Sequence, residues 1–159
     1  MASFSSFKGE KLIGSSNYIE WKTNADLFLE INGYMSYIDG TETSPDKELY
    51  YKVVDKLDDK GKITSSREEP ISPELGVRYA DQLSEYNRNS KRALGALKSI
   101  ILINNNERFK NKDEPDELYT AITSTFGQST LELIGQYFDK IVDNNYNSFN
   151  NIDKYTSNI

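Results

Sequence analysis

The side chains that carry out most enzyme chemistry are absent from this sequence of 159 residues, which contains no cysteine and no histidine. The chain therefore has no thiolate nucleophile, no imidazole base, no disulfide and no cysteine or histidine ligand for zinc. Only carboxylates, amines and hydroxyls remain, so any catalytic or metal site would have to be built from them.

Two motif fragments lie in one charged stretch, and neither is complete. Gly-Lys-Ile at 61–63 has the end of a phosphate-binding loop, but isoleucine stands where serine or threonine is needed, and the required upstream glycine is missing. A calcium-binding loop in the same stretch would place Lys56, Lys60 and Arg67 at positions that need oxygen ligands. We interpret the stretch as a solvated, charged loop.

The carboxylates are not spaced for catalysis either. The acidic pairs at 58–59 and 68–69 are adjacent in the chain, so their side chains point to different sides of any regular element. Asp-Gly-Thr at 39–41 has the residues of an aspartic-protease loop in the wrong order. We expect no catalytic residue, no metal ligand and no cofactor, and we predict that the protein is not an enzyme.

Composition narrows the remaining classes. The 19 Lys and Arg residues are outnumbered by 25 Asp and Glu, and the net charge of -6 argues against a large nucleic-acid footprint. The longest apolar run has only the residues 100–103, far below the roughly 20 that a membrane span needs. Since N-glycosylation sites and cysteines are also missing, we expect a soluble, cytoplasmic protein without membrane contact.

Apolar residues recur at helical spacing in nearly every segment, which predicts an all-α fold. The first helix is expected to follow the N-cap candidates Ser16 and Asn17 and to end at Asn32-Gly33. Its predicted buried stripe consists of Tyr18, Trp21, Ala25 and Phe28. A short apolar piece then leads into a turn at Asp39-Gly40.

Two identical start signals, Ser-Pro followed by an acid at 44–46 and 72–74, predict the next helices. The first would carry an apolar stripe over 49–57, and the second would form a long spine from Leu75 to Ile101 that stops at 104–106. Between them, residues 58–72 lack a pattern and are predicted to form a mobile surface loop.

The remaining segments predict three more helices. One begins at Pro115 and is closed by Gly127, the next begins at a capping box of Ser129 and Glu132, and a last one covers 149–159. The apolar residues predicted for the second of these helices are Leu131, Ile134, Tyr137, Phe138, Ile141 and Val142. The expected architecture is a compact bundle of about five to seven helices.

One stretch resembles a known family. Residues 12–21, Leu-Ile-Gly-Ser-Ser-Asn-Tyr-Ile-Glu-Trp, followed by a helix and the Ile-Asp-Gly turn at 38–40, resemble the start of the Gag polypeptide of copia-type LTR retrotransposons. The later helix at 115–126 is similar to a second Gag helix, with Tyr119 where tryptophan is more usual. The residues that carry the resemblance are Leu12, Gly14, Asn17, Tyr18, Trp21, Ile38, Gly40, Leu118, Tyr119 and Phe126.

This resemblance implies the N-terminal lobe of a retroviral-type capsid, which self-associates into a virus-like particle enclosing the RNA of the element. Residues 1–16 would be a lead and 17–159 the helical domain, with 148–159 expected to begin a linker or a second lobe. The implied partners are further copies of the chain or full-length Gag, and RNA would be bound only by regions outside this chain. Lys22, Asp26 and Glu30, expected to point outward from the first helix, are the interface candidates.

The motif residues also have a structural interpretation. Tyr18 and Trp21 lie one turn apart and can pack together, Asn17 can cap the helix, and Gly14 can permit a tight turn before it. Two other functions remain open at this stage. A domesticated lobe could bind a host peptide in a groove, or a capsid fragment could join a full-length lattice and disrupt it.

Overall fold

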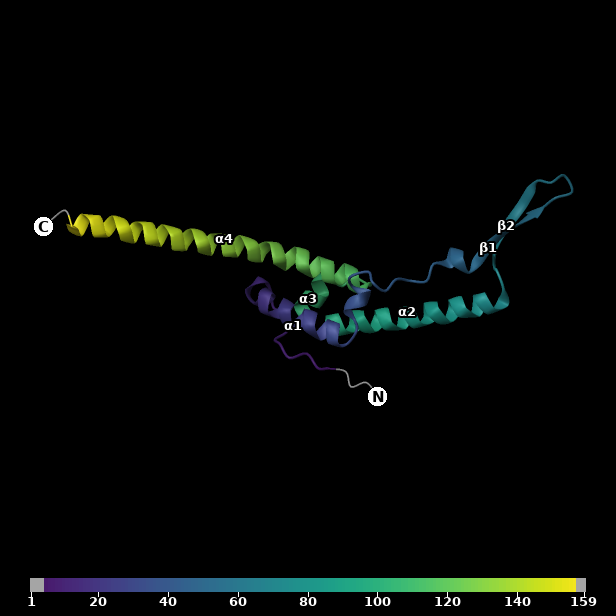
Figure 1. Ribbon diagram of the computed structural model, residues 1–159, viewed down its shortest axis with the longest axis horizontal. Coiled ribbons are helices and arrows are strands. Elements are labelled where there is room, and N and C mark those ends of the chain that lie inside the picture. The colour runs from purple at the N-terminus through teal and green to yellow at the C-terminus, as the bar shows by residue number, and fades with distance from the viewer. Residues whose placement is uncertain (1–4, 157–159) are drawn as a thin grey trace.

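The computed structural model describes residues 5–156, and in the last helix its side chains only as far as Gly127 and at 132, 134, 135, 137–139, 141 and 142. The long elements are α1 (Tyr18–Ile31), β1 (Tyr51–Leu57), β2 (Ile63–Pro70), α2 (Pro73–Ser99), α3 (Ile103–Arg108) and α4 (Pro115–Thr156). The short helical turns η1 (Ser15–Asn17), η2 (Met35–Tyr37) and η3 (Lys47–Leu49) lie between them. The molecule is elongated, with the hairpin at one end and the second half of α4 at the other (Figure 1).

Helices α1 and α2 confirm the predictions made from local signals. The stripe of α1 buries Tyr18, Trp21 and Ala25 as predicted, but Leu29 is buried in place of Phe28, which is only partly buried against the core. The helix ends where Gly33 adopts a φ of 71°. The side chain of Ser72 accepts a hydrogen bond from the backbone N–H of Leu75 and caps α2, which has proline in its first turn. Both helices therefore begin or end where their own sequence directs them.

The core lies where α1, the end of α2 and the start of α4 meet. Its largest fully buried side chains are Trp21, Leu12, Leu29, Leu97, Ile100, Ile101, Leu118 and Ile122. Leu12 joins this core through an isolated parallel bridge to Ile101, in which its N–H donates to the carbonyl of Ile100 at 3.0 Å. The lead segment is part of the folded body even before Leu12, because the ring of Phe7 packs edge-on against that of Phe28 with centroids 5.7 Å apart.

The hairpin β1–β2 overturns the prediction of an all-α fold. Residues 51–57, expected to be helical, form β1, and most of the expected loop 58–72 forms its antiparallel partner β2. The strands are joined by a turn in which Asp58 accepts hydrogen bonds from the backbone N–H groups of Lys60 and Lys62, while Gly61 adopts a φ of 76°. Such turn chemistry, together with the β-branched Val53 and Val54, outweighs the helical spacing.

The base of the hairpin packs against the start of α2. The ring of Tyr79 lies between those of Tyr50 and Tyr51, with centroids 5.5 and 5.3 Å away. A Cβ atom on Gly76 would lie only 3.0 Å from the Cβ of Pro70, so the glycine permits close contact between β2 and α2. The strands beyond this base are largely exposed.

A single helix, α4, replaces the three helices predicted over 115–159. It has 42 residues and continues through Gly127 and Ser129, so the predicted break does not occur, and Ile159 lies outside the described residues. A Cβ atom on Gly127 would lie 3.3 Å from the hydroxyl oxygen of Tyr18. This glycine therefore allows α1 and α4 to pack closely. Likewise, Asn104–Asn106 lie within α3, whereas α2 already ends at Ser99.

Candidate functional site

The aromatic residues of the Gag-like motif lie in the core. Trp21 is 1% exposed and its indole N–H donates to the carbonyl oxygen of Ile100 at 2.9 Å. Tyr18 stacks on Trp21 with ring centroids 6.1 Å apart, and Phe126 of α4 lies 6.4 Å from Tyr18 on a third element. These side chains hold the helices together and offer no surface for a ligand.

The polar and glycine positions of the motif act differently from what the sequence predicts. The side chain of Asn17 does not cap α1. It instead accepts from the backbone N–H groups of Ile13 and Gly14 and donates to the carbonyl of Lys11, so it fixes the preceding loop. Gly14 has a φ of 172°, which is ordinary extended backbone, and no described atom lies within 4 Å of a Cβ built on it. The structure therefore does not support the prediction that Gly14 permits a tight turn before the helix.

The other motif positions also serve the fold. Gly40 ends its turn with a φ of 82°, a conformation that favours glycine, and Ile38 packs against the core. On α4, Leu118 is fully buried and Tyr119 is partly buried at the edge of the same core. Nine of the ten motif positions therefore have a role in holding the fold together, and Gly14 is the exception.

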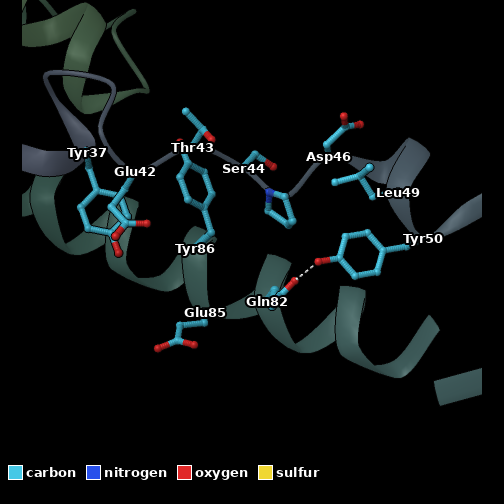
Figure 2. A pocket seen from close by; sticks show the side chains of 11 residues that line it. Tyr37, Glu42, Thr43, Ser44, Asp46, Leu49, Tyr50, Gln82, Glu85 and Tyr86 are labelled. Atoms are coloured by element: carbon cyan, nitrogen blue, oxygen red, sulfur yellow. Dashed lines mark hydrogen bonds between the residues drawn. The ribbon is translucent and has the colours of Figure 1, made fainter. Parts of the chain in front are cut away.

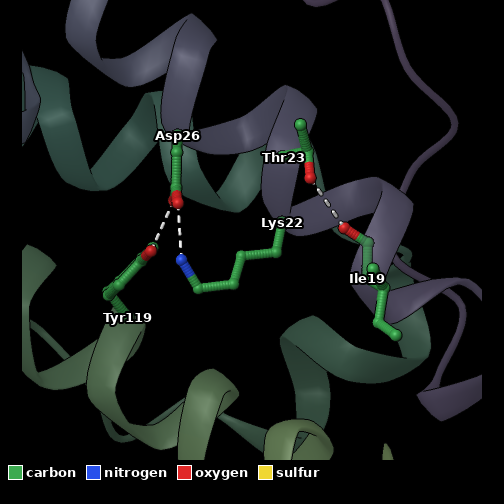
Figure 3. A network of polar contacts seen from close by, with 5 residues as sticks. All are labelled: Ile19, Lys22, Thr23, Asp26 and Tyr119. Carbon is green, nitrogen blue, oxygen red and sulfur yellow. Dashed lines mark hydrogen bonds and ion pairs between the residues drawn. The ribbon is translucent and has the colours of Figure 1, made fainter.

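Two of the three interface candidates, Lys22 and Asp26, form contacts with other residues of the same chain. The ammonium of Lys22 lies 2.5 Å from a carboxylate oxygen of Asp26, and the hydroxyl of Tyr119 donates to the other oxygen (Figure 3). These three groups link α1 to α4, while the side chains of Lys22 and Asp26 keep 39% and 34% of their surface exposed, so both stay at the surface but are paired within the chain. Glu30 is exposed, as expected for a surface position.

This contact between α1 and α4 also shifts pKa values. Burial raises the pKa of Tyr119 to about 12, and the hydrogen bond to the Asp26 carboxylate acts in the same direction because ionised tyrosine cannot donate it. Burial lowers the pKa of Lys22, but its hydrogen bonds to Asp26 and Tyr119 outweigh burial and leave that pKa above its ordinary value. The network therefore favours the charged lysine and the neutral tyrosine at ordinary pH.

The second half of α4 presents a row of exposed apolar side chains. This row, the α4 stripe, consists of Ile134, Phe138, Ile141 and Val142, which recur three, four and seven residues apart and so share one side of the helix. Phe138 is 64% exposed and Val142 is 60% exposed. The stripe begins beside a hollow of about 560 Å³ between Ile19 and Ile134 and continues along α4 away from the body.

A groove runs between α2 and the segment that leads from η2 to β1. A hollow of about 600 Å³ lies against Tyr37, Tyr50 and Tyr86, where the hydroxyl of Tyr50 contacts Gln82 at 2.6 Å (Figure 2). A second hollow of about 640 Å³ shares Tyr37 and Tyr86 with the first. We call the two hollows together the acidic groove, because their lining includes Asp39, Glu42, Asp46, Glu85, Glu114 and Asp116.

The charged side chains that line the acidic groove all carry negative charge. None of the described residues that line either hollow is lysine or arginine. Burial raises the pKa of Tyr86, and the negative charges of Glu114 and Asp116 raise it further. The groove is therefore suited to a cation and unsuited to a phosphate or a carboxylate.

Within the part of the chain that the structure describes, no three carboxylates come together in a way that could hold a metal ion. Among the described helices, none combines the length and the hydropathy that a bilayer span requires. The surfaces that remain as candidates are the α4 stripe and the acidic groove. The periodicity of the sequence identified the residues of the stripe but not their exposure. The groove has no sequence signal, because it joins residues as far apart as Tyr37 and Asp116, which are 79 positions apart in the chain.

No protein-family model, curated protein or solved structure matches the chain. The resemblance to copia-type Gag therefore stays a prediction that rests on the N-terminal motif and on the later helix at 115–126.

Proposed function

We propose that this chain is a structural, non-enzymatic lobe that associates with further copies of itself, as a building block of a virus-like shell of the copia Gag type in the cytoplasm. The observation that carries the proposal is the α4 stripe. It leaves Ile134, Phe138, Ile141 and Val142 exposed to water on a helix that extends past the body. An isolated helix is marginally stable in water, and apolar residues along one side favour a partner helix.

The size of the stripe supports a weak contact that is repeated many times. Four apolar side chains that each expose roughly 100 Å² would bury about 800 Å² in total when two copies meet, which is below the roughly 1,200 Å² of stable specific interfaces and in the range of weak, transient contacts. Contacts of this size gain strength when each subunit makes several of them. In this proposal RNA is bound by regions outside the chain, since the net charge of -6 opposes binding to phosphates.

The test is sedimentation of the purified chain from micromolar to millimolar concentration. We expect a reversible dimer that Phe138→Ser combined with Ile141→Ser weakens at least tenfold, because these substitutions remove the apolar centre of the stripe. The matched control is Glu132→Ser combined with Asp139→Ser. These are also exposed residues of α4, but at 3.6 residues per turn each lies about 100° or more around the helix from both Phe138 and Ile141.

Both double variants introduce the same residue type into the same helix, so a general loss of helicity would affect them equally. The proposal is contradicted by a chain that stays monomeric at every concentration, or by control and stripe variants that weaken association to the same extent. Electron microscopy of the concentrated wild-type chain then shows whether the association continues into tubes or particles.

A further inference from the structure

The hairpin presents a basic face. The register pairs Lys52 with Glu69, Val54 with Arg67 and Lys56 with Ser65, and opposed residues in a ladder share one side of the sheet. Glu69 forms an ion pair with Arg67. Among the described residues, no acid forms an ion pair with Lys52 or Lys56, and both lysines are exposed. We call Lys52, Lys56 and Arg67 the basic face.

The same chain also carries a surface of opposite charge. The acidic groove is lined by six carboxylates and by the rings of Tyr37, Tyr50 and Tyr86. Tyrosine rings can contact the aliphatic part of a lysine and stabilise its ammonium group. The two hollows, of about 600 and 640 Å³, are large enough for long side chains to enter.

The hairpin cannot reach the groove of its own chain. Tyr50 lines the groove and β1 begins at the next residue, and the hairpin then extends away from the body (Figure 1). At about 3.3 Å per residue, Lys56 lies roughly 20 Å along the strand from Tyr50. A contact that places the whole basic face, Lys56 included, in the acidic groove must therefore be made between two molecules.

We infer that the basic face of one copy docks in the acidic groove of a second copy. The contact is heterologous, because it joins two different surfaces, so each molecule can receive one neighbour and offer its hairpin to another. This inference rests on the proposed self-association and deepens it. A symmetric contact through α4 closes at a dimer, and a shell requires at least one further contact that does not.

RNA is the other polyanion that a basic face could bind. The observations favour a second copy, because the face has three cations, one of which is already paired, and the chain as a whole carries a charge of -6. The acids and tyrosines of the groove can also contact the lysines directly. Each chain carries one acidic groove and one hairpin, so every hairpin can bind one groove in a repeated assembly.

The test uses charge exchange in the full chain, followed by sedimentation at about 50 mM and about 500 mM salt. The hairpin variant is Lys52→Gln with Lys56→Glu, since glutamine at 52 avoids two carboxylates facing each other across the strands. The groove variant is Glu42→Gln with Glu85→Lys. The control is Lys91→Gln with Arg92→Glu, which changes the charge of exposed residues of α2 by the same amount as the hairpin variant.

We expect the wild type and the control to form species larger than a dimer at low salt and to lose them at high salt. The hairpin and groove variants should each stop at the dimer, with the larger association weakened about tenfold or more. An equimolar mixture of the two variants should restore it, because the exchanged charges are again complementary. Circular dichroism and urea midpoints equal to those of the wild type show that each variant is folded.

Three results would overturn the inference: larger species that persist in both variants, a mixture that does not recover, or a hairpin variant that loses binding to an RNA oligonucleotide while it assembles normally. The experiments distinguish the contact through the α4 stripe from the contact between the basic face and the acidic groove. Failure of the α4 proposal removes the dimer but leaves salt-sensitive chains of molecules, whereas failure of the present inference leaves a dimer that Phe138→Ser with Ile141→Ser dissociates.

Discussion

Replacement of Trp21 tests whether the Gag-like motif is a packing motif. The side chain is 1% exposed, and its indole N–H bonds to the carbonyl oxygen of Ile100. That oxygen also accepts the N–H of Leu12 at 3.0 Å, so it keeps one partner when the indole is removed. Trp21→Phe should therefore cost about 1 kcal/mol for the hydrogen bond and about 1 kcal/mol for the smaller ring.

Trp21→Ala removes the whole ring and should lower the free energy of unfolding by about 3 to 5 kcal/mol, a large part of the total stability of a small domain. The assay is urea unfolding followed by circular dichroism, because Trp21 is the single tryptophan and its fluorescence disappears with the substitution. Ile19→Ala in the same helix is the control. Ile19 is 56% exposed and its replacement should change stability by about 0.5 kcal/mol or less.

The reasoning is refuted if the free energy of unfolding of Trp21→Ala lies within about 1 kcal/mol of the wild-type value, because removal of a buried aromatic ring is expected to destabilise the fold by more than that. It is also refuted if Trp21→Phe is as destabilising as Trp21→Ala. In that case the hydrogen bond, and not the volume of the ring, would account for the stability.

Two further predictions concern the turns and the contact between α1 and α4. Gly40→Ala should lower the free energy of unfolding by about 1 kcal/mol, because Gly40 has a φ of 82°, whereas Gly14→Ala should cost nothing in the same urea assay because its φ is 172°. The folded-state pKa of Tyr119 is raised to about 12, so its contribution to stability is complete below pH 10 and is lost as the pH rises from 10 through 12. Tyr119→Phe should flatten this part of the stability profile, and an unchanged slope would show that Tyr119 ionises normally in the folded chain.

The parts of the fold that the sequence predicted correctly are those with local causes. Ser72 caps α2 through a bond to a residue three positions away, and the stripe of α1 is complete within its own helix. The hairpin was missed because Leu49, Tyr50, Val53, Val54 and Leu57 fit helical spacing, while their partner strand is mostly polar and has no period of its own. Only the pairing of the two strands resolves that ambiguity.

The candidate surfaces show the same limit. Lys22 and Asp26 were expected to point outward, and their true surroundings depend on Tyr119, which is 93 residues from Asp26 in the chain. The periodicity of α4 correctly grouped Ile134, Phe138 and Ile141 on one side of a helix. It could not reveal that the body ends before them, because a periodic pattern says which residues share a side and not what covers it.

The bridge between Leu12 and Ile101 has a consequence for how the chain folds during synthesis. The lead segment and α1 leave the ribosome before their partners, which are Ile100, Ile101 and, on α4, Leu118 and Phe126. The packing of Trp21 against its core partners can therefore be completed only after about a hundred further residues have been made. The hairpin, whose strands are joined by a short turn, can form long before this core closes. The last part of the fold to be completed thus contains residues that are translated long before their core partners.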